Sequence, residues 1–347
     1  MDLLKTLPSH SKWRHTPTPQ NARSFVSQAF LHEVGLTETT FSNCSETDIR
    51  RWSCQACTRL SSPGSLHIVD ANSNRAFVTT YTNWNVTVIF VRGTKNVANA
   101  ISDVNVEPAT WPKEWCMLQG AASKQELKMH KGFFDVWLDL REGIQRALGL
   151  SAKGERMSYK RDPRAPSRRV LLVGHSLGAA AAIIGLMELF SMGLDVLGVV
   201  AFESPLVFNR SAAYVFQDLL GPLCLRLTNY LDPVPHVPAV FGYTHVGLEM
   251  YFDRSGAFHL CDFQNVVACR DGNVPDEGCH CSSQDWLYPF FPVQHCKMPA
   301  YLGFNFCECD QNGNLTKFYV FQYLLWLVFV CLITLLIYYL MSYVWKM

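Results

Sequence analysis

The sequence lacks an excess of charge of either sign. Its 347 residues carry 30 Lys and Arg against 29 Asp and Glu, which gives a formal net charge of +1. A nucleic-acid-binding role depends on a strongly basic surface, and this balance gives it no support. The chain also shows no internal repeat. It is long enough for one sizeable α/β domain with appendages.

The N-terminal segment from Met1 to Gln28 lacks the apolar stretch of a secretory signal peptide. Prolines and arginines are spread through it instead. We therefore expect residues 1–40 to form a polar lead-in to a catalytic domain that occupies residues 41–317.

Charge is missing altogether from Phe318 to Trp345. As a helix this apolar run would be about 42 Å long, which exceeds the roughly 30 Å hydrocarbon core of a bilayer. Tyr and Trp residues lie near both of its ends, as in the aromatic belts of membrane proteins. We predict a single transmembrane helix over residues 318–345. Lys317 and Lys346 flank it with one charge each, so the positive-inside rule leaves its orientation open.

A Gly-x-Ser-x-Gly motif joins a predicted strand to a predicted helix. The aliphatic run that ends at Val173 is followed by Gly174, Ser176 and Gly178, and then by an alanine-rich helical stretch. This arrangement is typical of a nucleophile elbow, in which a sharp turn exposes a serine at the start of a helix. We expect that a Cβ at either glycine would collide with neighbouring backbone, and that Ser176 is held in a strained conformation.

Further stretches follow in a fixed order along the chain: Val86–Thr94, which ends in Arg-Gly-Thr; Met129–Phe134, with His-x-Gly-Phe; Asn229–Pro238, with Asp-Pro-Val-Pro; and Phe241–His245 followed by Glu249. Together with the serine motif they resemble the class 3 lipases, the family of the fungal triacylglycerol lipases. The resemblance implies an α/β-hydrolase fold with a mostly parallel central sheet, to which the C-terminal transmembrane helix would be added.

The resemblance also implies a catalytic serine with its partners. Ser176 would be the nucleophile and Asp232 the triad acid, which matches the order Ser, Asp, His of this fold. The oxyanion hole would be formed by the backbone N–H of Leu177 and by Thr94, through its N–H and hydroxyl. No metal or organic cofactor is expected.

The triad histidine is less clearly marked in the sequence. His295 precedes an aromatic-Leu-Gly-Phe stretch and lies most like the terminal histidine of the family, although two extra residues stand before the aromatic. His259 is the main alternative, and His236, His245 and His280 remain candidates. His245 fits a structural histidine of the family.

Most of the 13 cysteines lie in clusters outside the apolar run, which favours disulfides in an oxidising compartment. The alternative is zinc binding, in which Cys54/Cys57 and Cys307/Cys309 with His280 or His295 would supply thiolate and imidazole ligands. We expect the domain to be lumenal or extracellular. A cytosolic, tail-anchored enzyme is the other possibility, because no signal peptide is visible.

The sequence departs from the family at Glu203, where relatives commonly carry glycine, and at Leu206 and Phe208 in the same stretch. These changes indicate an altered pocket wall. We predict a membrane-anchored lipase that cleaves carboxylic esters of glycerolipids drawn from a lipid bilayer; protein partners are not indicated. The alternatives are a non-catalytic lipid-binding or interaction protein, and an esterase or acyltransferase on the same scaffold.

Overall fold

The computed structural model describes residues 28–54, 57, 60, 64–81, 86–93, 107–113, 115, 126–150, 169–229, 232, 234–238, 242–252 and 258–261. All of them belong to one compact unit, residues 1–306. The predicted transmembrane segment 318–345 lies outside the described residues. Within the described part, no helix is long and apolar enough to cross a membrane.

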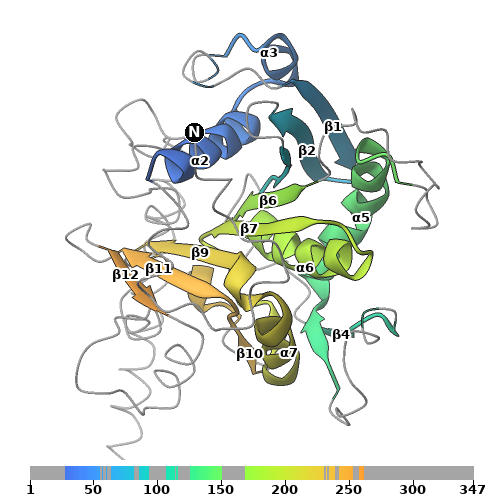
Figure 1. Ribbon diagram of the computed structural model, residues 1–347, viewed down its shortest axis with the longest axis vertical. Coiled ribbons are helices and arrows are strands. Elements are labelled where there is room, and N and C mark those ends of the chain that lie inside the picture. The colour runs from blue at the N-terminus through green and yellow to red at the C-terminus, as the bar shows by residue number, and fades with distance from the viewer. Residues whose placement is uncertain are drawn as a thin grey trace, which may run out of the picture. The chain divides into compact units, whose positions relative to one another are not determined.

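An eight-stranded sheet forms the centre of this unit, in the order β1-β2-β3-β6-β7-β9-β11-β12 (Figure 1). Its strands are β1 (Ser65–Ala71), β2 (Asn74–Tyr81), β3 (Val86–Val91), β6 (Val170–His175), β7 (Val196–Phe202), β9 (Cys224–Asn229), β11 (Leu248–Phe252) and β12 (Phe258–Cys261). The strands from β3 to β11 are parallel, and antiparallel strands close both edges. The predicted mostly parallel sheet is confirmed.

The central strands are buried because they carry apolar residues on both faces of the sheet. In β3, Ile89 and Val91 point into one hydrophobic cluster, while Val88 and Phe90 point into the other, as the two-residue period of a strand requires. Every residue of β6 is buried. Such continuous apolar runs are expected of parallel strands that are covered on both faces.

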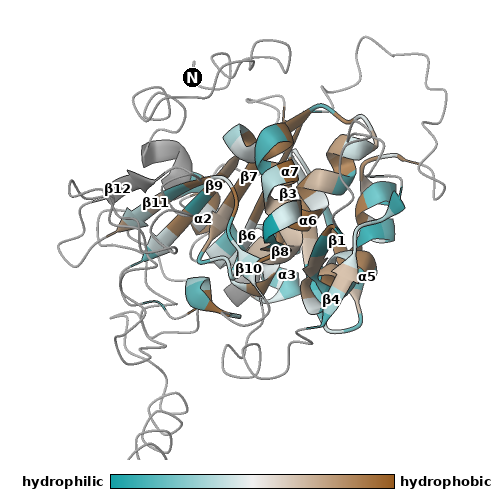
Figure 2. Ribbon diagram, turned by 90° about the horizontal axis from the view of Figure 1, so that it is seen from below, coloured by the Kyte–Doolittle hydropathy of each residue, from teal (hydrophilic) through white to brown (hydrophobic). Residues whose placement is uncertain are grey.

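Helices cover both faces of the sheet (Figures 1 and 2). On one face lie α2 (Gln28–Asn43) and α3 (Glu46–Arg51), which contribute Val34, Phe41 and Ile49 to the core. On the other lie α5 (Lys131–Ala147), α6 (Leu177–Ser191) and α7 (Arg210–Leu220). Because α2 crosses residue 40, the segment predicted as a polar lead-in contributes to the packing of this domain.

Helix α5 presents an apolar stripe to the core. Phe133, Trp137, Leu140 and Ile144 are all buried on the face that packs against α6 and the sheet. Gly185 of α6 makes room for Trp137, since a Cβ there would lie 2.4 Å from the indole ring. The indole N–H donates to the Glu188 carboxylate.

A second, four-stranded sheet lies beside α7. It consists of β4 (Pro108–Thr110), β5 (Lys128–His130), β8 (Phe208–Asn209) and β10 (Tyr243–Thr244), in the order β10-β8-β5-β4. The Asn209 side chain caps α7 by accepting the N–H of Ala212 at 3.0 Å. Short 3-10 helices at Gly221–Leu223 and Val234–His236 complete the described elements.

Candidate active site

Ser176 occupies the turn between β6 and α6, where the sequence places the nucleophile elbow. Its backbone has φ 57° and ψ −128°, a conformation that costs a non-glycine residue roughly 1–3 kcal/mol. The surrounding structure holds this turn, because the Ser176 N–H donates to the Phe202 carbonyl of β7 at 2.9 Å. The predicted strained backbone at the serine is confirmed.

The two flanking glycines are required by close backbone contacts. A Cβ on Gly174 would lie 2.5 Å from the carbonyl oxygen of Gly178, and a Cβ on Gly178 would lie 2.1 Å from the carbonyl oxygen of Val91. Real Cβ atoms essentially never approach other atoms so closely. The expected collisions are therefore confirmed, and Gly178 brings the start of α6 directly against β3.

The N-terminus of α6 provides the positive end of a helix dipole beside the serine. Leu177 is the first residue of α6, and an N–H in the first turn has no acceptor within its own helix. Such a group is suited to stabilise a developing oxyanion. Gly93 packs against this turn, since its Cβ would lie 2.7 Å from the His175 carbonyl oxygen. Thr94, the other predicted oxyanion residue, lies outside the described residues.

Asp232 follows β9 and lies at the same sheet edge as Ser176. The strands β6, β7 and β9 run parallel, so their carboxyl ends meet at one edge, where α/β folds bind ligands. Asp232 is 1% exposed. Its Oδ1 accepts the N–H of Val234 at 2.9 Å, and its own N–H donates to the Asn229 carbonyl at 3.1 Å. The carboxylate is thus held by the backbone around it.

A second buried carboxyl group lies beside Asp232. Glu203 follows β7 directly, is fully buried, and is within hydrogen-bond distance of the Asp232 carboxyl group. Burial, and then the negative charge of Asp232, raise the pKa of Glu203 well above its ordinary value of 4.5. Sequence reasoning identified this position only as a departure from the family. Its signal was an acidic residue placed directly after a buried strand.

Three of the histidine candidates lie in the described part of the chain, and two lie outside it. His245 is buried, and its Nε2 lies 2.7 Å from the carbonyl oxygen of Pro235, which agrees with a structural role. His259 belongs to β12, where its backbone pairs with Tyr251 of β11. His236 ends a short 3-10 helix. His295 and His280 lie outside the described residues, so the triad histidine stays a prediction.

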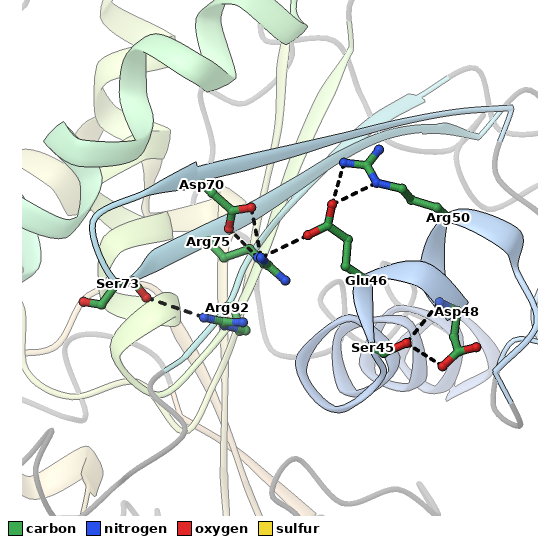
Figure 3. A network of polar contacts seen from close by, with 8 residues as sticks. All are labelled: Ser45, Glu46, Asp48, Arg50, Asp70, Ser73, Arg75 and Arg92. Atoms are coloured by element: carbon green, nitrogen blue, oxygen red, sulfur yellow. Dashed lines mark hydrogen bonds and ion pairs between the residues drawn. The ribbon is translucent and has the colours of Figure 1, made fainter.

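A polar network supports the end of β3, just before the predicted oxyanion residue (Figure 3). Arg75 of β2 binds Asp70 and also Glu46 of α3, the latter at 3.3 Å. The guanidinium of the neighbouring Arg92 donates to the Ser73 carbonyl at 3.5 Å. Burial, and then the charge of Arg75, lower the pKa of Arg92. Through the β1–β2 hairpin, the network links α3 to Arg92, which directly follows β3.

The cysteines of the described part do not all form disulfides. Cys54 and Cys57 are bonded to each other, so this pair offers no thiolates for the zinc alternative. Cys44 and Cys224 are free thiols, so the disulfide expected for the cluster of residues 44 to 57 does not include Cys44. Cys224 lies inside the sheet at the start of β9, and burial raises the pKa of its thiol to about 12.

Comparison with known proteins agrees with this geometry. Residues 88–242 match the family model described as lipase (class 3). A secreted mono- and diacylglycerol lipase 2 of Gibberella zeae is 28% identical over 219 residues, which cover 53% of this chain and 49% of the relative. A lipase of Rhizomucor miehei is 30% identical over 169 residues, covering 47% of this chain and 40% of the relative.

The fold is shared with solved lipase structures. The crystal structure of a lipase from Rhizopus microsporus var. chinensis aligns with a TM-score of 0.57 and 21% identity, covering 84% of this chain and 90% of the other. The chain spans about half the length, or less, of the first curated relatives that it matches. Residues 88–242, which include the serine elbow, are thus similar in sequence to the class 3 lipases, and the described residues share the α/β-hydrolase fold of solved lipases.

Proposed function

We propose that this protein is a membrane-anchored serine lipase that hydrolyses carboxylic ester bonds of glycerolipids. The observation that carries the proposal is Ser176 on its strained turn, at the N-terminus of α6 and at the same sheet edge as the buried Asp232. Relatives named as mono- and diacylglycerol lipase, and as phospholipase A1 in Oryza sativa, support a glycerolipid ester as the substrate class.

The proposed mechanism uses an acyl-serine intermediate. The hydroxyl of Ser176 attacks the ester carbonyl while the triad histidine, His295 or alternatively His259, takes its proton. Asp232 fixes the tautomer of that histidine and stabilises its cation. The N–H of Leu177 and the donors of Thr94 stabilise the oxyanion, and each such donor contributes about 3 kcal/mol in comparable sites. The histidinium gives this proton to the departing alcohol, and water then attacks the acyl-enzyme, which releases the fatty acid and restores Ser176.

The proposed setting is the surface of a bilayer. Residues 318–345 would anchor the protein, and the substrate would be a lipid of that membrane, either an acylglycerol or a phospholipid. The Cys54–Cys57 disulfide supports a lumenal or extracellular catalytic domain, as does the secreted nature of the relative from Gibberella zeae.

A fluorophosphonate probe tests the serine, because only a hydroxyl activated by a general base reacts at a useful rate. We expect Ser176 to be labelled and Ser176→Ala to lose both labelling and lipid hydrolysis. Ser191→Ala is the matched control at the other end of α6, where the hydroxyl only donates to the Glu188 carbonyl at 2.7 Å. Hydrolysis that survives in Ser176→Ala, with products identified by mass spectrometry, would exclude this mechanism.

Two further variants test the histidine. Triad members act as a unit, so removing the imidazole costs about as much as removing the serine. His295→Ala should therefore lower turnover by orders of magnitude, and the double variant with Ser176→Ala should be hardly worse than either single variant. If His259→Ala is inactive instead, the histidine assignment changes while the lipase proposal stands.

A further inference from the structure

Glu203 has no role in the mechanism above, yet both its backbone conformation and its burial are unfavourable for a glutamate. It lies immediately after β7 with φ 52° and is completely buried. A positive φ costs an ordinary side chain roughly 1–2 kcal/mol relative to glycine, and burial of an unpaired carboxylate costs several times more. A residue that is unfavourable in both respects marks a place where the carboxyl group itself has a function to fulfil.

The contacts of Glu203 join it to the loop that carries Asp232. Its N–H donates to the Leu227 carbonyl at 2.8 Å, and its Oε2 accepts the N–H of Asn229 at 3.1 Å. The carboxyl group also lies within hydrogen-bond distance of Asp232. No donor among the described residues reaches Oε1. Two ionised carboxylates cannot hydrogen-bond to each other, because both only accept.

The surrounding charges disfavour a second negative charge at this place. Asp232 is the nearest, and Glu249 of β11 adds to its effect on Glu203. Arg226 of β9 forms an ion pair with Glu249 at 3.5 Å and donates through Nε to the Val246 carbonyl at 2.8 Å. Two carboxyl groups that share a buried site hold one proton between them, and here burial and the charge of Asp232 raise the pKa of Glu203.

We propose that Glu203 is a positioning residue whose protonated carboxyl group donates a hydrogen bond to Asp232 and holds it in the orientation that the triad histidine needs. This inference rests on the proposed function, since it assigns Asp232 to the triad. The N–H of Val234 fixes Oδ1 of Asp232, and Glu203 constrains the same carboxylate from the neighbouring strand. The proton stays on Glu203 throughout catalysis, so the pair carries a single negative charge, located on Asp232.

The proposal has a consequence at alkaline pH. Removal of the proton from Glu203 places a second negative charge beside Asp232 and replaces a hydrogen bond with repulsion. Turnover should therefore decline at alkaline pH in the wild-type protein. A glutamine at position 203 donates through its amide and cannot ionise, so it should keep the orientation of Asp232 and remove this decline.

Two substitutions separate the hydrogen bond from the fold. Glu203→Gln should keep kcat within about threefold of wild type at neutral pH and lose the alkaline decline. Glu203→Gly suits the positive φ but removes the donor; we expect kcat to fall about 10-fold to 100-fold with KM little changed, the size of loss that follows when a catalytic group is misplaced by about 1 Å. Wild-type kcat and wild-type pH profile in Glu203→Gly would overturn the proposal.

Infrared spectroscopy tests the proton without reference to activity. The full-length wild-type protein at neutral pH should show the carbonyl stretch of a protonated carboxyl group that is absent from Glu203→Gln, and its absence from wild type would also overturn the proposal. This measurement decides the matter even if Glu203→Gly fails to fold. Failure of the proposed function has a different signature, namely equal hydrolysis by wild type and Ser176→Ala.

Discussion

At the scale of single residues, the elbow depends on a glycine that lets a helix touch a strand. The Cβ of an alanine at position 178 would lie 2.1 Å from the Val91 carbonyl oxygen. The atoms that it would meet are backbone atoms of Val91 and Arg92, which have little room to move. We expect Gly178→Ala to lower the free energy of unfolding by about 1–3 kcal/mol, as overpacking does, and to abolish hydrolysis because Ser176 is displaced.

Gly149→Ala is the matched control for that variant, measured by urea denaturation and turnover. Gly149 also has a positive φ, 71°, but a Cβ there meets nothing within 4 Å. Its substitution should cost about 1 kcal/mol of stability and leave turnover unchanged. Full activity in Gly178→Ala would show that the contact between α6 and β3 is not needed for catalysis.

We expect His130 to make folding sensitive to acid. It is fully buried, its ring stacks on Phe133 at 3.9 Å between centroids, and burial lowers its pKa from 6.5 to about 4. The unfolded chain takes up this proton below pH 6.5, whereas the folded protein does not until about pH 4. Stability should therefore fall as the pH drops through this window, by at most about 3 kcal/mol, and be unaffected above it.

Replacing His130 with phenylalanine keeps an aromatic ring beside Phe133 and removes the titrating group. When the pH is lowered from 7 to 4, the melting temperature of wild type should fall further than that of His130→Phe. Parallel losses in the two proteins would show that other groups cause the acid sensitivity.

The sequence located Ser176 and Gly178 because the motif that marks them is local. The role of Asp232 was predicted from the resemblance of its Asp-Pro-Val-Pro stretch to the class 3 lipases, and it stays a prediction. The sequence could not assign Glu203, because the proposed role of that carboxyl group depends on burial and on its contact with Asp232, which follows a different strand. Long-range contacts of this kind arise only when β7 and β9 pair.

At the scale of elements, β9 and β11 share a buried ion pair. Arg226 and Glu249 are 1% and 0% exposed and lie opposite each other in the parallel ladder. Removing one partner leaves the other charge buried, which costs about 3–5 kcal/mol, whereas an apolar pair of similar volume is often neutral or stabilising. Arg226→Met and Glu249→Leu should each destabilise strongly, and the double variant should recover most of the loss.

This double-mutant cycle is best measured by denaturant unfolding, which yields a coupling energy for the pair. Simple addition of the two single losses would mean that the residues contribute independently and that the pairing itself does not hold β11 against β9. Turnover of the double variant offers a second reading, because β9 leads into the loop of Asp232.

The longer elements were predictable because their apolar residues recur with a clear period. The stripe of α5 and the runs of β3 and β6 are examples. The small sheet of β4, β5, β8 and β10 was not predicted, since strands of two or three residues show no period and form only by pairing with distant segments. The extent of α2 was also missed, because the stretch after residue 36 is rich in threonine and carries little helical pattern.

At the scale of the whole molecule, the sheet edge and the tail would act on the same substrate. In the proposed function, the site at the carboxyl ends of β6 and β9 would supply the chemistry, and residues 318–345 would supply the location. A membrane anchor raises the effective concentration of the enzyme at the surface that holds its substrate. The proposed anchor should therefore affect hydrolysis of bilayer lipids far more than hydrolysis of dissolved esters.

Removal of residues 318–347 tests this division. The full-length protein should remain with membranes after an alkaline carbonate wash, while the truncated protein should be released. Both should hydrolyse a dissolved short-chain ester at similar rates, but the truncated protein should be slower on lipid vesicles, because its catalytic domain must find the surface from solution.

A second variant, with Leu327 and Leu335 both replaced by lysine, keeps the chain length. Each charge near the centre of a transmembrane helix costs about 2.5–3.5 kcal/mol, so this variant should behave like the truncation. Release of the full-length protein by the wash would show that residues 318–345 do not span the bilayer, and equal rates on vesicles would show that the tail does not direct the enzyme to its substrate.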